Sequence, residues 1–228
     1  MAKKKVTRKE LLKKDDEFIS LSHRFFMYVS AHGKQIQIAL ISLIIIIAII
    51  AGIGLYFRHL NKKALSAYNL AYRNLVSDFS SEVKEGTIKQ SVEELEKLIE
   101  KYGWTKMATL AIPQLAYLKF GQGKYDEAIS LYQTYLKKDK SGSIYRSMAH
   151  FGLAAAYEAK HDHQSAIGNL KKIIDQENNF LKEEALFSLG RVYSLAGERE
   201  MSRKTFQEFV NQFRESALFP LAKAHLNQ

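Results

Sequence analysis

The chain contains no cysteine, which excludes disulfide bonds but does not identify the compartment in which the protein works. No segment alternates apolar and polar residues with a period of two, so no β-sheet is expected. The sequence also lacks a nucleophile, base and orienting group that motif evidence would bring together in one site. We therefore predict an all-α protein that is not an enzyme and has no catalytic residues.

Motifs for metal ions and nucleotides are also incomplete. His161 and His163 flank Asp162, but a metal site needs a third or fourth ligand from a neighbouring element, and the sequence indicates none. Residues 121–124, Gly-Gln-Gly-Lys, lack the preceding strand and the Gly-Lys-Ser/Thr ending of a phosphate-binding loop. Both segments are interpreted as polar turns between helices, so no metal and no cofactor is predicted.

One long apolar run is present, from Ile36 to Phe57, and it carries no charged residue. As an α-helix it is about 33 Å long at about 1.5 Å per residue, and it exceeds the bilayer core of about 30 Å. A helix buried in a soluble core would keep a polar side. A signal peptide would have a shorter apolar stretch nearer to Met1, followed by a cleavage site of small residues. The run therefore predicts an uncleaved transmembrane helix over residues 36–57.

Positive charge is unequally distributed about this run. Nine lysines and arginines precede it, whereas Arg58, Lys62, Lys63 and Arg73 are the basic residues within about 20 positions after it. Because basic segments stay in the cytoplasm, we predict a cytoplasmic N-terminus and an external domain. The bias disappears when only the nearest 20 residues on each side are counted.

Residues 1–35 are predicted to be a cytoplasmic basic tail. From Asp16 onward, Phe18, Leu21, Phe25 and Val29 recur at helical spacing, which indicates an amphipathic helix on the inner leaflet that ends near Gly33. A nucleic-acid-binding arm is the alternative for the lysines at the start of the tail. The adjacent apolar run favours the membrane surface, so no nucleic-acid partner is predicted.

The chain after the span is organised as helical repeats. Residues 58–108 are predicted to form a degenerate helix pair, with helices at Ala64–Phe79 and about Thr87–Lys101. Residues 109–228 contain three similar segments, which begin at Thr109, Ser147 and Glu183, followed by a terminal capping helix from Ser216 to Leu226. A spacing in the thirties with two helices per unit indicates a helical solenoid.

The first helices of the three segments carry the pairs Leu115-Ala116, Leu153-Ala154 and Leu189-Gly190. These pairs lie at the position of the Leu-Gly pair of tetratricopeptide repeats, which the segments resemble. Their second helices have Ala128, Ala166 and Ser202 at the small-residue position, followed by Tyr132, Leu170 and Phe206 as large packing residues. Lys119 departs from the tyrosine that the next two units have as Tyr157 and Tyr193.

The resemblance implies a partner-binding surface on the first helices of the repeats. Transfer of the repeat positions predicts the binding residues Tyr117, Phe120, Met148, Phe151, Phe187, Arg191 and Leu195. The alternative is that these side chains pack between repeats or under the terminal helix, and both interpretations stay open at this point. A carboxylate-binding clamp is not expected, because Pro113, Phe151 and Phe187 occupy the first of its positions.

The single span is preceded by Phe25-Phe26 and Gly33-Lys34, and it is followed by a degenerate helix pair and tetratricopeptide-like units. This layout of the whole chain is similar to that of the YfgM-like ancillary subunits of the Sec translocon. The resemblance implies an inner-membrane protein with a periplasmic domain that works beside the translocon and a membrane-anchored chaperone in protein export. The alternative is a structural adaptor for cell-division or envelope-assembly complexes. Ala48 and Gly52 form a small-xxx-small pair compatible with a homo-oligomer.

Overall fold

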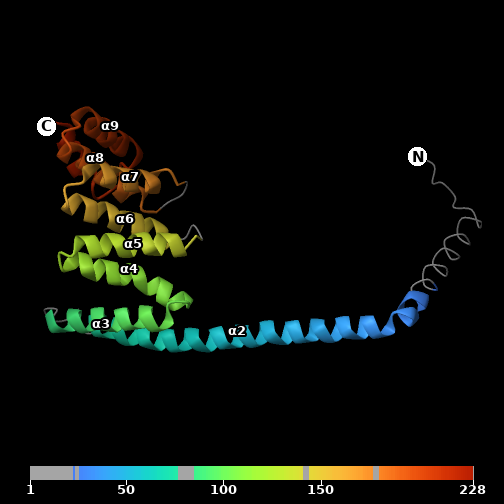
Figure 1. The fold of residues 1–228 in the computed structure, drawn as a ribbon. Coiled ribbons are helices and arrows are strands. Elements are labelled where there is room, and N and C mark those ends of the chain that lie inside the picture. The colour runs from blue at the N-terminus through green and yellow to red at the C-terminus, as the bar shows by residue number, and fades with distance from the viewer. Residues whose placement is uncertain (1–22, 24–25, 77–84, 141–143, 177–179, 228) are drawn as a thin grey trace, which may run out of the picture. The chain divides into compact units, whose positions relative to one another are not determined.

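The computed structural model describes residue 23 and residues 26–76, 85–140, 144–176 and 180–227 (Figure 1). All the regular secondary structure in these residues is helical, without a strand, so the predicted all-α class is confirmed. The chain divides into two compact units, Met1–Arg58 and His59–Gln228.

The first unit contains the apolar part of α2, a helix of 44 residues from Gly33 to Val76. Within the described residues, α2 is the one helix long and apolar enough to cross a membrane, and none of its most apolar stretch is buried. Residues 26–31 are helical and residue 32 lies in a turn, close to the predicted helix end at Gly33. Asp16, where that helix was expected to begin, lies outside the described residues.

The structure corrects the prediction that a separate helix begins at Ala64. Instead, α2 continues from the apolar run to Val76 without a break. The connecting residues 58–63 contain neither proline nor glycine, so nothing in them interrupts the helical hydrogen bonds. Ala64 and Ala71 are fully buried, because this part of α2 packs on the next helices of the chain.

The second unit is a helical solenoid, in which each helix from α3 onward packs against the next one in the chain (Figure 1). The helix α3 spans Glu85–Tyr102, and three helix pairs come after it. They are α4 (Lys106–Gly121) with α5 (Tyr125–Lys138), α6 (Ile144–Ala159) with α7 (His163–Ile174), and α8 (Lys182–Leu195) with α9 (Arg199–Gln212). The last helix, α10, covers Phe219–Leu226, so it begins three residues after the predicted Ser216.

The turns inside the three pairs share a left-handed residue. Gly123 and Gly197 have φ values of +74° and +78°, and His161 has a φ of +60° at the corresponding place. Glycine adopts this conformation without the penalty that a Cβ brings. The Asp162 carboxylate caps α7 by accepting a hydrogen bond from the Ser165 amide. Gly123 and His161 therefore occupy positions that the turn geometry requires.

Small residues allow the two helices of each repeat to cross closely. Ala128 and Ala166 are fully buried, and Ser202 is buried with its hydroxyl donating to the Gly190 carbonyl over 2.8 Å. The Phe206 ring covers Gly190 so closely that a Cβ there would lie 2.9 Å from the ring. The alignment of residues 109–228 to the repeat thus identified the positions where helix contact excludes larger side chains.

Lys119, which departs from the repeat pattern, joins the first repeat to the helix before it. Its Nζ lies 2.7 Å from the Glu96 carboxylate of α3 and 2.8 Å from the Glu127 carboxylate of α5. Burial opposes the charged form of Lys119, but its hydrogen bonds to Glu127 and Glu96 together raise its pKa above the ordinary value. The charge of the buried Lys119 is therefore balanced by carboxylates from two neighbouring helices.

Candidate protein-interaction groove

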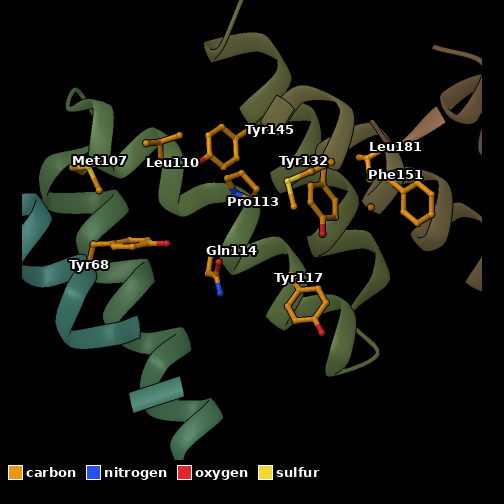
Figure 2. Close-up of a pocket in the computed structure, with 12 residues that line it drawn as sticks. Tyr68, Met107, Leu110, Pro113, Gln114, Tyr117, Tyr132, Tyr145, Phe151 and Leu181 are labelled. Carbon is orange, nitrogen blue, oxygen red and sulfur yellow. The ribbon is translucent and has the colours of Figure 1, made fainter. Parts of the chain in front are cut away.

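An open groove of about 490 Å³ lies in the second unit, between α2, α4 and α6 (Figure 2). The helix α2 contributes Tyr68, and α5 contributes Tyr132. The remaining lining residues are Met107, Leu110, Pro113, Gln114 and Tyr117 of α4, Tyr145, Met148, Phe151 and Gly152 of α6, and Leu181 just before α8. The groove therefore lies along the first helices of the first two repeats.

The helical period explains why α4 presents one apolar face to this groove. Leu110, Pro113, Gln114 and Tyr117 are spaced three or four residues apart or lie next to one another, so they share one side of the helix. Tyr145 and Met148 repeat the pattern on α6. Two neighbouring helix faces thus form the walls of the groove.

Tyr132 of α5 lines the groove and packs closely against Gly152 of α6. A Cβ on Gly152 would lie 2.3 Å from the Tyr132 ring, so the close approach of this ring requires glycine. Burial, followed by the charge interaction with Tyr117, raises the pKa of Tyr132 to about 12. Tyr132 therefore stays neutral at physiological pH.

The groove is lined by uncharged residues. Its polar groups are the Gln114 side chain and the tyrosine hydroxyls, including that of Tyr68. Burial, then the neighbouring Tyr72 and Tyr145, raise the pKa of Tyr68 above its ordinary value. The lining residues of this groove therefore provide aromatic and thioether contact area with a few hydrogen-bonding groups, and no catalytic acid or base for neutral pH.

Three of the seven binding residues expected from the repeat come together in this groove. They are Tyr117, whose side chain is 65% exposed, Met148, which is 50% exposed, and the half-buried Phe151. Tyr117 and Met148 contribute apolar surface that no other described element covers. The geometry thus groups them as neighbours on the walls of one cleft.

Phe187 and Phe120 lie elsewhere. The Phe187 ring is 5.6 Å from the Phe206 ring and 5.7 Å from the Phe209 ring, measured between centroids, and His225 of α10 lies on the same cluster at 6.2 Å. Phe187 therefore packs under the terminal helix, in agreement with the core alternative. Phe120 packs on the buried residues of the first repeat, with its ring centroid 5.5 Å from that of Tyr125.

Arg191 and Leu195 also lie outside the groove. The Arg191 guanidinium pairs with both carboxylate oxygens of Glu158, with 2.7 Å between Nη2 and Oε2. This bidentate ion pair links α8 to α6, so the charge of Arg191 is already paired within the solenoid. Leu195 is 53% exposed at the end of α8.

The repeat alignment did not identify Tyr68, Leu110 or Tyr145 as lining residues. Tyr68 belongs to α2, before the recognisable repeats, and Leu110 and Tyr145 lie outside the transferred binding positions. The sequence does contain a signal for Leu110 and Tyr145, which is the three- and four-residue spacing along α4 and α6. That spacing shows which residues share a face, but not which face stays open.

Comparisons with known proteins agree with this architecture. A family model described as a tetratricopeptide repeat-like domain matches residues 28–228, whereas no curated protein matches the chain. The repeats of a Podosopora anserina putative kinesin light chain are similar at 18% identity and a TM-score of 0.58, covering 73% of this chain and 84% of that chain.

Two further solved structures are similar to this chain. A tetratricopeptide repeat protein from Parabacteroides merdae matches at 18% identity and a TM-score of 0.56, over 71% of this chain and 59% of that chain. MamA from Desulfovibrio magneticus matches at 16% identity and a TM-score of 0.55, over 72% of this chain and 92% of that chain. Identities this low show a shared fold and nothing about partners.

Proposed function

The chain belongs to the tetratricopeptide repeat-like domain family, and we propose that it is a membrane-anchored scaffold that binds partner proteins through the groove between α4 and α6. The observation that carries the proposal is the exposure of Tyr117 and Met148 in an uncharged cleft. Domains of this family generally mediate protein–protein interactions. No catalytic activity is proposed.

The chemistry of the groove favours an apolar or aromatic segment of a partner. Aromatic side chains provide contact area at low conformational cost, and buried aromatic anchors tend to dominate interface energies. Gln114 and the hydroxyl of the exposed Tyr117 are placed to pair with the backbone of an extended segment. The charged terminus of a partner chain would find no ionised side chain among the lining residues of the groove.

We further propose that residues 36–57 cross the inner membrane of a bacterium, with residues 1–35 in the cytoplasm and the repeats in the periplasm. The similarity in layout to YfgM-like proteins favours a place beside the Sec translocon and a membrane-anchored chaperone in protein export. The alternative is a structural adaptor for cell-division or envelope-assembly complexes. A homo-oligomer is compatible with both.

The proposed topology predicts the fate of the repeats in spheroplasts. A reporter fused after Gln228 is expected to be active only as a periplasmic reporter, and external protease should remove the domain from Ala64 onward. The physical reason is the basic segment before the span, which stays in the cytoplasm. Cleavage that requires lysis of the spheroplasts would reverse the proposed orientation.

The groove predicts a loss of binding without a loss of stability. The double variant Tyr117→Ser/Met148→Ser is expected to capture partners at least about tenfold more weakly, because truncation of interface anchors costs about 2 kcal/mol or more. Its melting temperature should be almost unchanged, since both side chains are largely exposed. Affinity capture in mild detergent and thermal unfolding of the same protein measure the two effects.

Two exposed leucines serve as matched controls. Leu221→Ser on α10 and Leu195→Ser on α8 remove side chains that are 55% and 53% exposed, and neither lines the groove. Both variants are expected to retain partner capture. If they lose it as strongly as the groove variant does, general surface hydrophobicity explains the binding and the groove does not.

Crosslinking distinguishes the two proposed roles. A photoreactive amino acid in place of Met148 should form crosslinks to the partner that occupies the groove. Translocon subunits or a membrane-anchored chaperone are the proteins expected in these crosslinks. Cell-division or wall-assembly proteins among the products would favour the alternative. A well-folded protein that crosslinks only from positions outside the groove would contradict the proposed binding site.

A further inference from the structure

Trp104 is the single tryptophan of the chain, and it is almost completely exposed. Its side chain is 91% exposed, the largest fraction among the large apolar side chains of the described residues. It lies in the connection between α3 and α4, which passes beside α2 (Figure 1). An indole left in water at this place is unexplained by the packing of the solenoid.

Hydrogen bonds fix the turn that carries Trp104 on both sides. The Thr105 amide donates to the Tyr102 carbonyl over 2.7 Å, and the Thr105 hydroxyl oxygen accepts the Ala108 amide over 3.1 Å. The Lys138 ammonium donates to the Gly103 carbonyl over 3.1 Å. A Cβ on Gly103 would lie 2.8 Å from the Ile99 carbonyl oxygen, so this tight turn requires glycine. The exposure of Trp104 is therefore set by an ordered turn.

This turn is tethered close to the end of the apolar run. The Met107 amide donates a hydrogen bond of 3.2 Å to the Asn61 side-chain oxygen, and Asn61 lies four residues after Phe57. Four residues span at most about 14 Å even when fully extended. Within the unbroken helix α2 the same four residues rise only about 6 Å. The interfacial region adds about 5–8 Å on each side of the bilayer core, so Asn61 and the Met107 amide bonded to it lie at the level of the lipid surface.

The residues around Trp104 suit a lipid surface. Lys101 and Lys106 flank it in the chain and are exposed, and Lys138 reaches the same turn. Glu100 is the one carboxylate within five residues of Trp104 in the sequence. Tryptophan is enriched at the membrane–water interface, where its ring contacts acyl chains and its N–H stays near water. Lysines near the surface are attracted to anionic headgroups.

We infer that Trp104 and its flanking lysines bind the bilayer surface from which α2 emerges, so that the α3 end of the solenoid is held against the membrane. The inference rests on the proposed anchoring of residues 36–57. A protein pocket that receives the indole is the competing explanation. The short tether to the span and the excess of lysines favour the lipid.

The intrinsic fluorescence of the full-length protein tests this contact, because all tryptophan emission comes from one position. In nanodiscs of phosphatidylethanolamine and phosphatidylglycerol, both bilayer faces stay open to solvent. We expect emission shifted to the blue, quenching by lipids brominated near the headgroup, and loss of quenching by aqueous iodide. The matched control is Trp104→Phe/Leu221→Trp, which moves the tryptophan to exposed α10 and should show the opposite quenching.

Three outcomes would overturn the inference. Iodide quenching as strong as in the control would place Trp104 in water. Protection from iodide without quenching by brominated lipid would indicate a second copy of the chain over Trp104. Extraction of the protein from cell membranes by alkaline carbonate would overturn the anchoring together with this inference, whereas the first two results leave the anchoring intact.

A charge variant tests the contribution of the lysines. Lys101→Gln/Lys106→Gln should reduce quenching by brominated lipid in discs that contain phosphatidylglycerol and leave it unchanged in discs of phosphatidylcholine alone. Circular dichroism verifies that the fold is retained. Equal quenching of the variant and the unmodified protein in both discs would exclude the lysines from the contact.

Discussion

Replacement of Ile46 and Ile47 by arginine is expected to remove the protein from the carbonate-resistant membrane fraction. The two residues lie at the centre of the apolar run from Ile36 to Phe57, and both are exposed on α2. Each arginine at the centre of a transmembrane helix costs about 2.5–3.5 kcal/mol on insertion scales. The pair therefore opposes much of the favourable transfer of the apolar side chains, and carbonate extraction of cell membranes measures the loss.

The matched control is the double variant Ile46→Leu/Ile47→Leu. Leucine preserves the apolar character and side-chain volume, so this variant should stay in the membrane fraction. Retention of the arginine variant after carbonate extraction would contradict a membrane-spanning role for this segment. Extraction of both variants would instead indicate attachment through a protein complex.

Phe206→Ala is expected to destabilise the second unit by about 3–5 kcal/mol, the usual cost of truncating a buried phenylalanine. Phe206 is completely buried, and its ring stacks on His225 of α10 with a centroid distance of 4.6 Å. It also covers Gly190 and contacts Phe187. The resulting cavity would loosen the contact between α9 and the terminal helix. Because a domain of this size loses about 2–4 °C per kcal/mol, the melting temperature should fall by about 10 °C.

Phe180→Ala provides the control for this substitution. Phe180 is 55% exposed, so its truncation should change the free energy of unfolding by no more than about 0.5 kcal/mol. Thermal unfolding of the full-length variants, followed by circular dichroism in mild detergent, compares them directly. Equal melting temperatures for the two variants would show that the aromatic cluster under α10 does not stabilise the solenoid.

Local patterns sufficed for most of the architecture. The apolar run up to Phe57 and the helical spacing after it predicted a membrane span followed by a solenoid. The structure confirms the solenoid and shows that the run forms a helix long and apolar enough to cross a membrane. The small residues at Ala128, Ala166 and Ser202 indicated where helices cross, because close packing excludes larger side chains whatever their surroundings. The turn at Gly123 arises from its own backbone preference.

The candidate groove could not be predicted to the same extent. Phe151 and Phe187 occupy equivalent repeat positions, yet Phe151 lines the open cleft and Phe187 packs against Phe206 and Phe209. The difference arises because α10 adds His225 to the cluster around Phe187 at the end of the stack, whereas Phe151 lies beside a cleft. Repeat alignment compares residues within a unit and contains no information about the helix that packs on the last unit.

The sequence by itself determined the all-α class, the repeated helix pairs and the apolar run, because these depend on residues that are near one another in the chain. It did not reveal that α2 continues through residues 58–63 without a break. Only the tertiary structure decided that Lys119 pairs with Glu96 and Glu127. It also decided that Tyr68 of α2 lines the groove. The turn of Trp104 is likewise held near the end of the apolar run by a tertiary contact, the hydrogen bond from Met107 to Asn61. These contacts join helices that are separated in the chain. Which face of a helix is covered depends on the neighbours that fold against it, and helical spacing specifies the face without specifying those neighbours.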